Sequence, residues 1–237
     1  LENPGQYEQI VSSAHGGIAG FGGAFLTMVG LKFFFDEEKD VHWVEMIEKQ
    51  LSRISALPAI EIAFLLLVLW TISHNLPDGE ASTFLQSGLF GIIAFIAVDA
   101  LGTALELREE KLKLAGAAVR AGLGGFIYLN VLDASFSFDA VIGAFALSNN
   151  MVVIALGLSI GAMFVRSLTL LMVEKGTLSE YRYLEHGAFW AILALGAIML
   201  TSVIWDVPDI VTSLIGVVLI ALSIRRSVLH NRQSRSS

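Results

Sequence analysis

The residues most able to carry chemistry lie in one short stretch, VLDASFSFDAVIGAFALSNN, at positions 131–150. Its two aspartates stand in a very apolar part of the chain, where a carboxylate is costly unless it has a partner. In extended backbone, side chains alternate between two sides, so four oxygen-bearing residues would project to one side: Asp133, Ser135, Ser137 and Asp139. On a continuous helix the two aspartates would face different directions. The pattern therefore predicts a ladder of oxygen ligands for a divalent cation, provided that the helix is unwound.

A second interpretation of these polar residues stays open. Asp139 would cap a helix that begins at Ala140, and Ser148 or Asn149 would cap the next span. In the ligand interpretation, Asn149 and Asn150 would instead add amide oxygens on the outer side of the site. The capping interpretation leaves both carboxylates at or near membrane depth without a cation, which is the costlier arrangement.

Composition places this stretch in a lipid bilayer. Hydrophobic residues make up 55% of the 237 and charged residues only 16%, whereas a soluble domain has about a quarter of its residues charged. Apolar runs of a length typical of membrane helices recur along the whole chain. The absence of cysteine excludes disulfides and thiolate metal sites, so any metal must be held by oxygen or imidazole. We predict an all-α, polytopic bundle that forms a single membrane domain over residues 1–237.

About seven spans are predicted, and basic residues set their direction. The spans cover residues 12–35, 55–73, 83–105, 114–132, 150–173, 186–205 and 208–224. With seven crossings, all 15 lysines and arginines fall on one side of the membrane, which the positive-inside rule makes the cytoplasmic side. The basic tail, 225–237, is then cytoplasmic. The segment 36–54 is either an amphipathic helix on the cytoplasmic membrane surface or a plain solvated linker helix.

The region between Lys113 and Lys175 contains more apolar residues than its crossings need. Both lysines are predicted to be cytoplasmic, so the number of crossings between them is even, and two helices of ~20 residues are enough. One straight helix through the surplus would be too long for the bilayer even if tilted. We therefore predict a broken helix or a re-entrant segment near 133–149, with non-helical backbone lining a cavity.

Three further polar residues are weaker candidates for the site. Asp99, in AVDALG, lies within the third span, where it either belongs to a functional site or pairs with a basic side chain such as Arg120. Arg166 either extends to the cytoplasmic membrane surface or balances a carboxylate inside the bundle. His186, at the mouth of a helix, is either a metal ligand or an interfacial residue.

Several motifs in this half of the chain resemble the second half of the TerC family of integral membrane proteins, and in particular its large multi-span bacterial branch. They are LDASFSFDAV, SNN, GLSIGAMFVRSL and YRYLEHGAFW, within residues 113–205. The resemblance implies a transporter fold of two inverted three-helix repeats, related to the LysE exporters. It also implies a place in the bacterial inner membrane and a role in manganese efflux or tellurium resistance.

The same resemblance divides the chain into repeats. Residues 113–205 would be the second repeat and 12–35 the last span of the first, whose acidic motif would lie upstream of Leu1. The two spans within 55–105 have no counterpart in shorter family members and would be an insertion, and 208–224 would be a final span. The first-repeat half of the site would therefore be missing.

An internal comparison agrees with inverted repeats. The first span reads HGGIAGFGGAFLTM and the sixth reads HGAFWAILALGAIMLT; both open with His-Gly, and Gly23-Ala24 corresponds to Gly196-Ala197. Charge counting runs these two spans in opposite directions, as an inverted repeat requires.

Small residues also recur at helical spacing. Such residues predict faces where helices pack closely, and they lie in the first and fifth spans at Gly16, Gly20, Ala24, Gly157 and Gly161.

Transport is the function that these features favour, with a divalent cation as the substrate. Mn²⁺ accepts carboxylate, carbonyl and water ligands more readily than Mg²⁺, which holds its own waters tightly. Export of a small organic solute and a membrane scaffold without transport are the alternatives. HExxH, GxSxG and a cysteine nucleophile are absent from the sequence, and we expect no enzymatic activity. We expect the lipid bilayer and a metal ion as partners and no nucleic acid; no bound cofactor is predicted, and the oligomeric state is not predicted.

Overall fold

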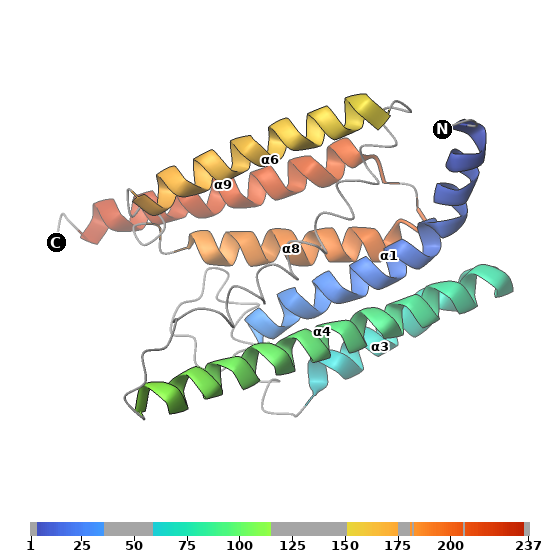
Figure 1. The fold of residues 1–237 in the computed structure, drawn as a ribbon, viewed down its shortest axis with the longest axis horizontal. Helices are drawn as coiled ribbons and strands as arrows, with labels where there is room; N and C mark the ends of the chain where they lie inside the picture. Colours follow the sequence, from blue (N-terminus) through green and yellow to red (C-terminus); the bar gives the residue numbers. More distant parts are fainter. Residues whose placement is uncertain are drawn as a thin grey trace.

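The computed structural model describes residues 4–35, 59–114, 151–174, 181, 183–205 and 207–234 (Figure 1). All regular structure in these ranges is α-helical, which confirms the predicted fold class. The helices are α1 (Pro4–Phe34), α3 (Ile60–Ser73), α4 (Asp78–Leu114), α6 (Met151–Glu174), α8 (Leu184–Thr201) and α9 (Asp209–Ser234).

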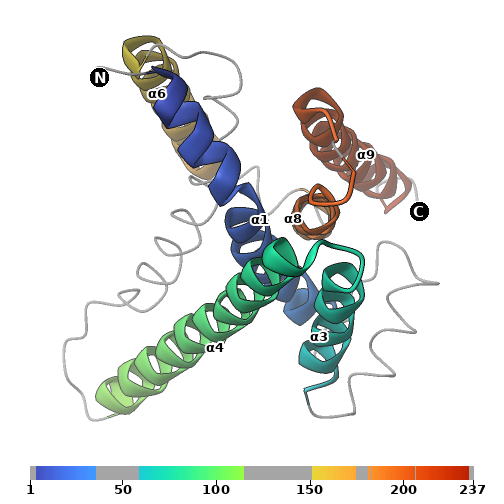
Figure 2. The same cartoon turned by 90° about the vertical axis from the view of Figure 1, so that its right-hand side faces the viewer.

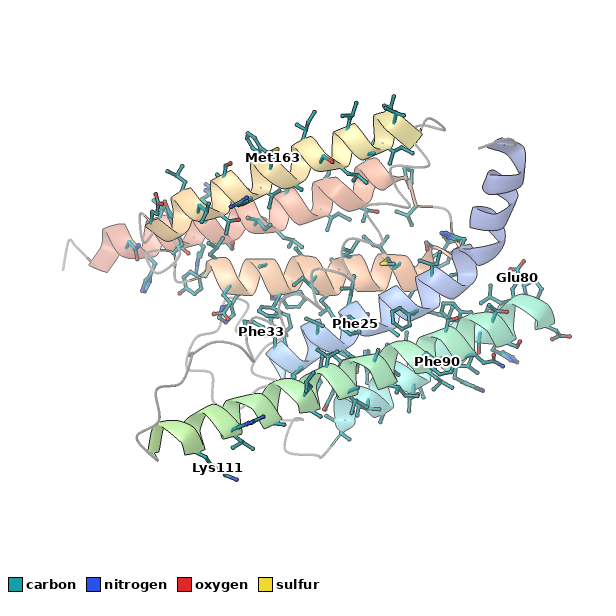
Figure 3. All side chains as sticks on the ribbon, viewed as in Figure 1. Phe25, Phe33, Glu80, Phe90, Lys111 and Met163 are labelled. Carbon is teal, nitrogen blue, oxygen red and sulfur yellow. The ribbon has the colours of Figure 1, made fainter. Side chains whose placement is uncertain are left out.

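Five of these helices contain a segment long and apolar enough to cross a bilayer. The segments are His15–Phe34, Asp78–Ala104, Val152–Leu171, Leu184–Thr201 and Ile210–Asn231. Helix α3 is apolar but has only 14 residues. The side chains of Phe90 and Met163 are 64% and 72% exposed (Figure 3). A surface of this kind is unfavourable in water and suits lipid, so the chain is a multi-pass membrane protein.

The described helices run in the relative directions that the charge pattern predicted. Helices α1, α4, α6 and α9 run one way, and α3 and α8 run the other way (Figure 1). The basic residues with described side chains all lie in the C-terminal halves of the first four: Lys32, Arg108, Lys111, Arg166, Arg225 and Arg226. They therefore gather toward one end of the bundle, where Lys111 lies, while Glu80 marks the opposite end of α4 (Figure 3).

The described helices differ from the predicted spans mainly at their ends. Helix α1 begins at Pro4 rather than at residue 12, and α9 continues to Ser234, beyond the predicted limit at residue 224. Helix α4 extends from the end of its apolar segment at Ala104 to Leu114 through the charged sequence LELREEKLKL. Hydropathy locates the membrane-embedded part of a helix, and these helices continue past it.

Helix α1 is the centre of the bundle. It lies between α4 and α8, while α3 packs beside α4 and α9 beside α8 (Figure 2). The largest fully buried apolar side chains come from four of these helices: Phe25, Leu26 and Met28 of α1, Leu65 and Leu69 of α3, Phe84 of α4 and Leu200 of α8. Because three helices meet on α1, its faces require small residues.

The contact between α1 and α8 depends on glycine. A Cβ added to Gly196 would lie 2.8 Å from the backbone nitrogen of Thr27 and 2.7 Å from its Oγ1, so only a hydrogen fits there. The Thr27 hydroxyl is buried and has no conventional hydrogen-bond partner in the described structure. A Cβ at Gly23 would likewise lie 2.8 Å from Cγ of Leu200.

These two contacts involve positions that the sequence comparison aligns. The sequence comparison that aligns Gly23 with Gly196 also aligns Thr27 with Leu200. Gly23 faces Leu200 and Gly196 faces Thr27, so the two contacts join aligned positions in an antiparallel register. The two helices are antiparallel (Figure 1), as the repeat hypothesis requires.

Close packing also occurs between α1 and α4. A Cβ at Gly20 would lie 2.6 Å from the carbonyl oxygen of Phe84, and Ala24 is completely buried. The prediction of a packing face is thus confirmed at Gly20 and Ala24. At Gly16, Gly157 and Gly161, no atom of the described structure lies within 4 Å of an added Cβ.

The α1–α8 contact predicts that Gly196→Ala destabilises the protein, by about 1–3 kcal/mol in the free energy of unfolding, because the new methyl overlaps Thr27. Gly161→Ala is the matched control: it adds the same methyl to a helix without meeting a neighbouring side chain or helix within 4 Å, and should leave stability unchanged or raise it by up to about 1 kcal/mol. Chemical or thermal unfolding of the purified protein in detergent measures both. Equal stability of the two variants would contradict the close α1–α8 contact.

Candidate functional site

The principal predicted site lies outside the described residues. Its proposed ligands and the predicted helix break all fall in this part of the chain: Asp133, Ser135, Ser137, Asp139, Asn149, Asn150 and the segment 133–149. The predicted fourth span, 114–132, also lies outside them, apart from its first residue. These assignments stay predictions. The three weaker candidates, in contrast, are all described.

Asp99 forms an ion pair with Lys32 of α1. The pair joins two membrane-spanning helices whose residues are 67 positions apart in the sequence. The interpretation that Asp99 pairs with a basic side chain is therefore confirmed, but the partner is Lys32 and not the suggested Arg120, which lies outside the described residues. Lys32 is one of the 15 basic residues that set the predicted topology.

The packing of α1 against α4 brings these two charges together. The helices run parallel, and a Cβ at Gly91 would lie 3.2 Å from Cβ of Ala24. Lys32 lies eight residues after Ala24, and Asp99 lies eight residues after Gly91. Equal rise along two parallel helices places the charges at the same depth, ~12 Å beyond the close contact.

The pair lies inside the apolar part of the bundle, near its basic end. Lys32 is in the last turn of α1, and Asp99 precedes the end of the apolar segment of α4 at Ala104 by five residues, or ~7.5 Å. The Lys32 side chain is 50% exposed and that of Asp99 is 30% exposed. Pairing neutralises a carboxylate that would otherwise be costly at this depth.

His186 is packed among aromatic rings and is only 5% exposed. Its ring meets that of Phe33 edge to face, with centroids 5.3 Å apart, and Phe33 stacks on Phe189 at 3.7 Å. This cluster closes the α1–α8 contact at the end where α8 begins. The described residues contain no group of three or more His, Asp or Glu side chains that could hold a metal. The surroundings of His186 favour the interfacial interpretation over the ligand interpretation.

Helix α9 anchors the start of α8 next to this cluster. The backbone N–H of Tyr183 donates a hydrogen bond to Oγ of Ser227 at 2.9 Å, and Gly187 lies directly against Ser223. Both serines are completely buried, and each hydroxyl also donates to a carbonyl of its own helix. Polar contacts of this kind hold α8 and α9 together in an apolar environment.

Arg166 is exposed on α6, where every residue from 161 to 170 is exposed. Within the described ranges the structure shows no ion pair for it. Its position in the C-terminal half of α6 places it toward the basic end of the bundle. These observations favour extension of the side chain to the membrane surface over neutralisation of a buried carboxylate.

A cavity of about 360 Å³ between α1, α3 and α8 was not predicted. Apolar side chains such as Leu31, Val68 and Leu193 form most of its lining, together with Thr27 and Thr201. The Thr201 hydroxyl is occupied by a hydrogen bond to the carbonyl of Ala197. The lining contains no carboxylate, so this space is unsuited to a metal ion. Three separate helices form it, and no local sequence pattern could have indicated it.

A comparison with known families identifies the chain. The family described as "Protein of unknown function (DUF475)" matches residues 1–234. The chain belongs to this family. No curated protein and no solved structure matches this DUF475 chain significantly. The resemblance to the TerC family therefore stays a prediction from the motifs.

The ion pair predicts a small energetic coupling between Lys32 and Asp99. Lys32→Met and Asp99→Asn should each lower the free energy of unfolding, and the double variant should lose less than the sum of the two. The difference should be about 0.5–1 kcal/mol, because both side chains keep part of their exposure. Unfolding of the four proteins in detergent gives this coupling energy; strict additivity would show that the two side chains do not interact.

Proposed function

We propose that this DUF475 protein is a multi-pass membrane transporter that exports a divalent cation, Mn²⁺ or a metal of similar chemistry. The DxSxSxD pattern of Asp133 to Asp139 carries the proposal. In unwound backbone it offers two carboxylates and two hydroxyls on one side, and freed carbonyl groups complete an oxygen site. Asn149 and Asn150 would contribute amide oxygens on the outer side. The TerC resemblance supports the same metal chemistry.

The architecture of the described helices is compatible with transport. Transporters built from inverted repeats bind their substrate between the repeats and expose it to each side in turn. The opposite directions of α1 and α8, whose sequences align at Gly23 and Gly196, are compatible with such a repeat. Asp99 adds a carboxylate at membrane depth, and intramembrane carboxylates commonly belong to ion pathways.

A small organic solute is the alternative substrate, and the apolar cavity beside α1 is the observation that favours it. About 360 Å³ is within the size range of small-molecule sites. The two hypotheses differ in their response to metal, because an ion that binds only the folded protein raises its stability by RT ln(1 + [L]/Kd). Mn²⁺ should raise the unfolding temperature if the metal is the substrate and leave it unchanged if the solute is.

Metal flux tests the proposed site directly. In vesicles containing the purified protein, Asp139→Asn and Asp133→Asn should each reduce Mn²⁺ transport at least about tenfold, since each removes a charge that offsets the dehydration of the ion. Asp78→Asn is the matched control because Asp78 lies in the first turn of α4, at the opposite end of the bundle from the basic residues. Mn²⁺ flux through this variant should stay within about twofold of the wild-type flux. Normal flux in both site variants would refute the proposal.

We also propose that the protein lies in the bacterial inner membrane with its C-terminus in the cytoplasm. The chain contains no cysteine, so a single introduced cysteine reports one position without background. In spheroplasts, an impermeant maleimide should label Gly79→Cys at the start of α4 and leave Ser234→Cys at the end of α9 unlabelled until the membrane is opened. The reverse pattern would invert the proposed orientation.

A further inference from the structure

The Lys32–Asp99 ion pair is not what holds α1 and α4 together. Those helices already touch backbone to backbone at Gly20, where an added Cβ would clash with the carbonyl of Phe84, and at Gly91, where it would clash with the carbonyl of Phe21. Such contacts keep two membrane helices together without any charge. The ion pair lies beyond them, toward the basic end of the bundle, so its two side chains can separate while the helices stay in contact.

The two members of the pair do not depend on each other equally. Lys32 is in the last turn of α1, and its long side chain can carry the ammonium group to the membrane surface if Asp99 is lost. Asp99 has a short side chain and lies farther from the end of the apolar segment of its helix. It therefore needs a cation close by, whereas Lys32 is able to leave.

The pair is also accessible. Half of the Lys32 side chain and nearly a third of the Asp99 side chain stay exposed. Part of the carboxylate is therefore left uncovered, and a cation that enters from the basic end of the bundle meets it beside Lys32. Lys32 and a divalent ion cannot occupy the same carboxylate at once, because the two positive charges repel each other in a medium of low dielectric constant.

We propose that Lys32 is a tethered counter-cation that competes with the transported ion for Asp99. This inference rests on the proposed function and adds a specificity-determining and release-promoting residue to it. When no metal is present, the ammonium group occupies the carboxylate; an arriving cation displaces it, and its return promotes release of the cation. Transport requires such a balance, because an ion must bind well enough to enter and weakly enough to leave.

Metal binding by charge variants at position 32 tests the competition. The probe is Mn²⁺ alone, titrated against the unfolding temperature of the full chain in detergent. If Lys32 occupies Asp99 about four-fifths of the time, Lys32→Met should lower the apparent Kd about fivefold, and Lys32→Arg, which keeps the charge, should bind as the wild type does. In an Asp99→Asn background, the exchange of Lys32 for Met should have no effect on the apparent Kd.

A second measurement uses the wild-type protein and does not depend on the folding of any variant. Displacement by metal frees the Lys32 amine, so Mn²⁺ should accelerate its acylation by an amine-reactive reagent several-fold, as followed by mass spectrometry. Lys111, exposed on the charged extension of α4 and outside the apolar segment, is the internal control and should react at the same rate with and without metal.

The outcomes separate this inference from the proposed function. Wild-type binding of Mn²⁺ with no gain in Lys32→Met, or an equal gain in the Asp99→Asn background, would overturn the competition and leave transport standing. An unchanged or slower acylation of Lys32 in the presence of metal would also overturn it. If neither the wild type nor Lys32→Met responds to Mn²⁺, both proposals fail together.

Discussion

The bundle depends on how closely helix backbones can approach α1. Two helices that cross near contact distance leave room only for hydrogen at the crossing, and α1 makes such crossings on two sides, with α8 at Gly23 and Gly196 and with α4 at Gly20. In a bilayer, lipid is as apolar as a leucine side chain, so helices associate through this close packing rather than through avoidance of water. The positions of the polar groups follow from the register that these glycines impose.

The polar groups in the described helices fall into two kinds. One kind is enclosed and structural: Ser223 and Ser227 connect α8 to α9, and His186 is packed against Phe33. The other kind is charged and partly accessible, and Lys32 with Asp99 is the described example. This separation matters for function because an enclosed group cannot exchange partners, whereas an accessible ion pair can.

Much of the architecture was predictable from the sequence, because it depends on local composition. Apolar runs located the spans, and the basic residues correctly predicted the relative directions of the described helices. The ends of α4 and α9 were missed because their charged last turns remain helical outside the apolar layer. The Lys32–Asp99 pair could not be predicted, since it depends on the register of two helices, and that register is set by contacts such as Ala24 with Gly91. The apolar cavity among α1, α3 and α8 was unpredictable for the same reason. The DxSxSxD site remains a prediction.

The extension of α4 past Ala104 gives the bundle a rigid arm. Ten residues, LELREEKLKL, continue the helix to Leu114 without interruption, which corresponds to ~15 Å of charged rod beyond the apolar layer. Asp99 lies close to the base of this rod. Any change of tilt that follows the exchange of partners at Asp99 would be magnified at the tip, so that an event inside the bilayer becomes a displacement in the aqueous phase.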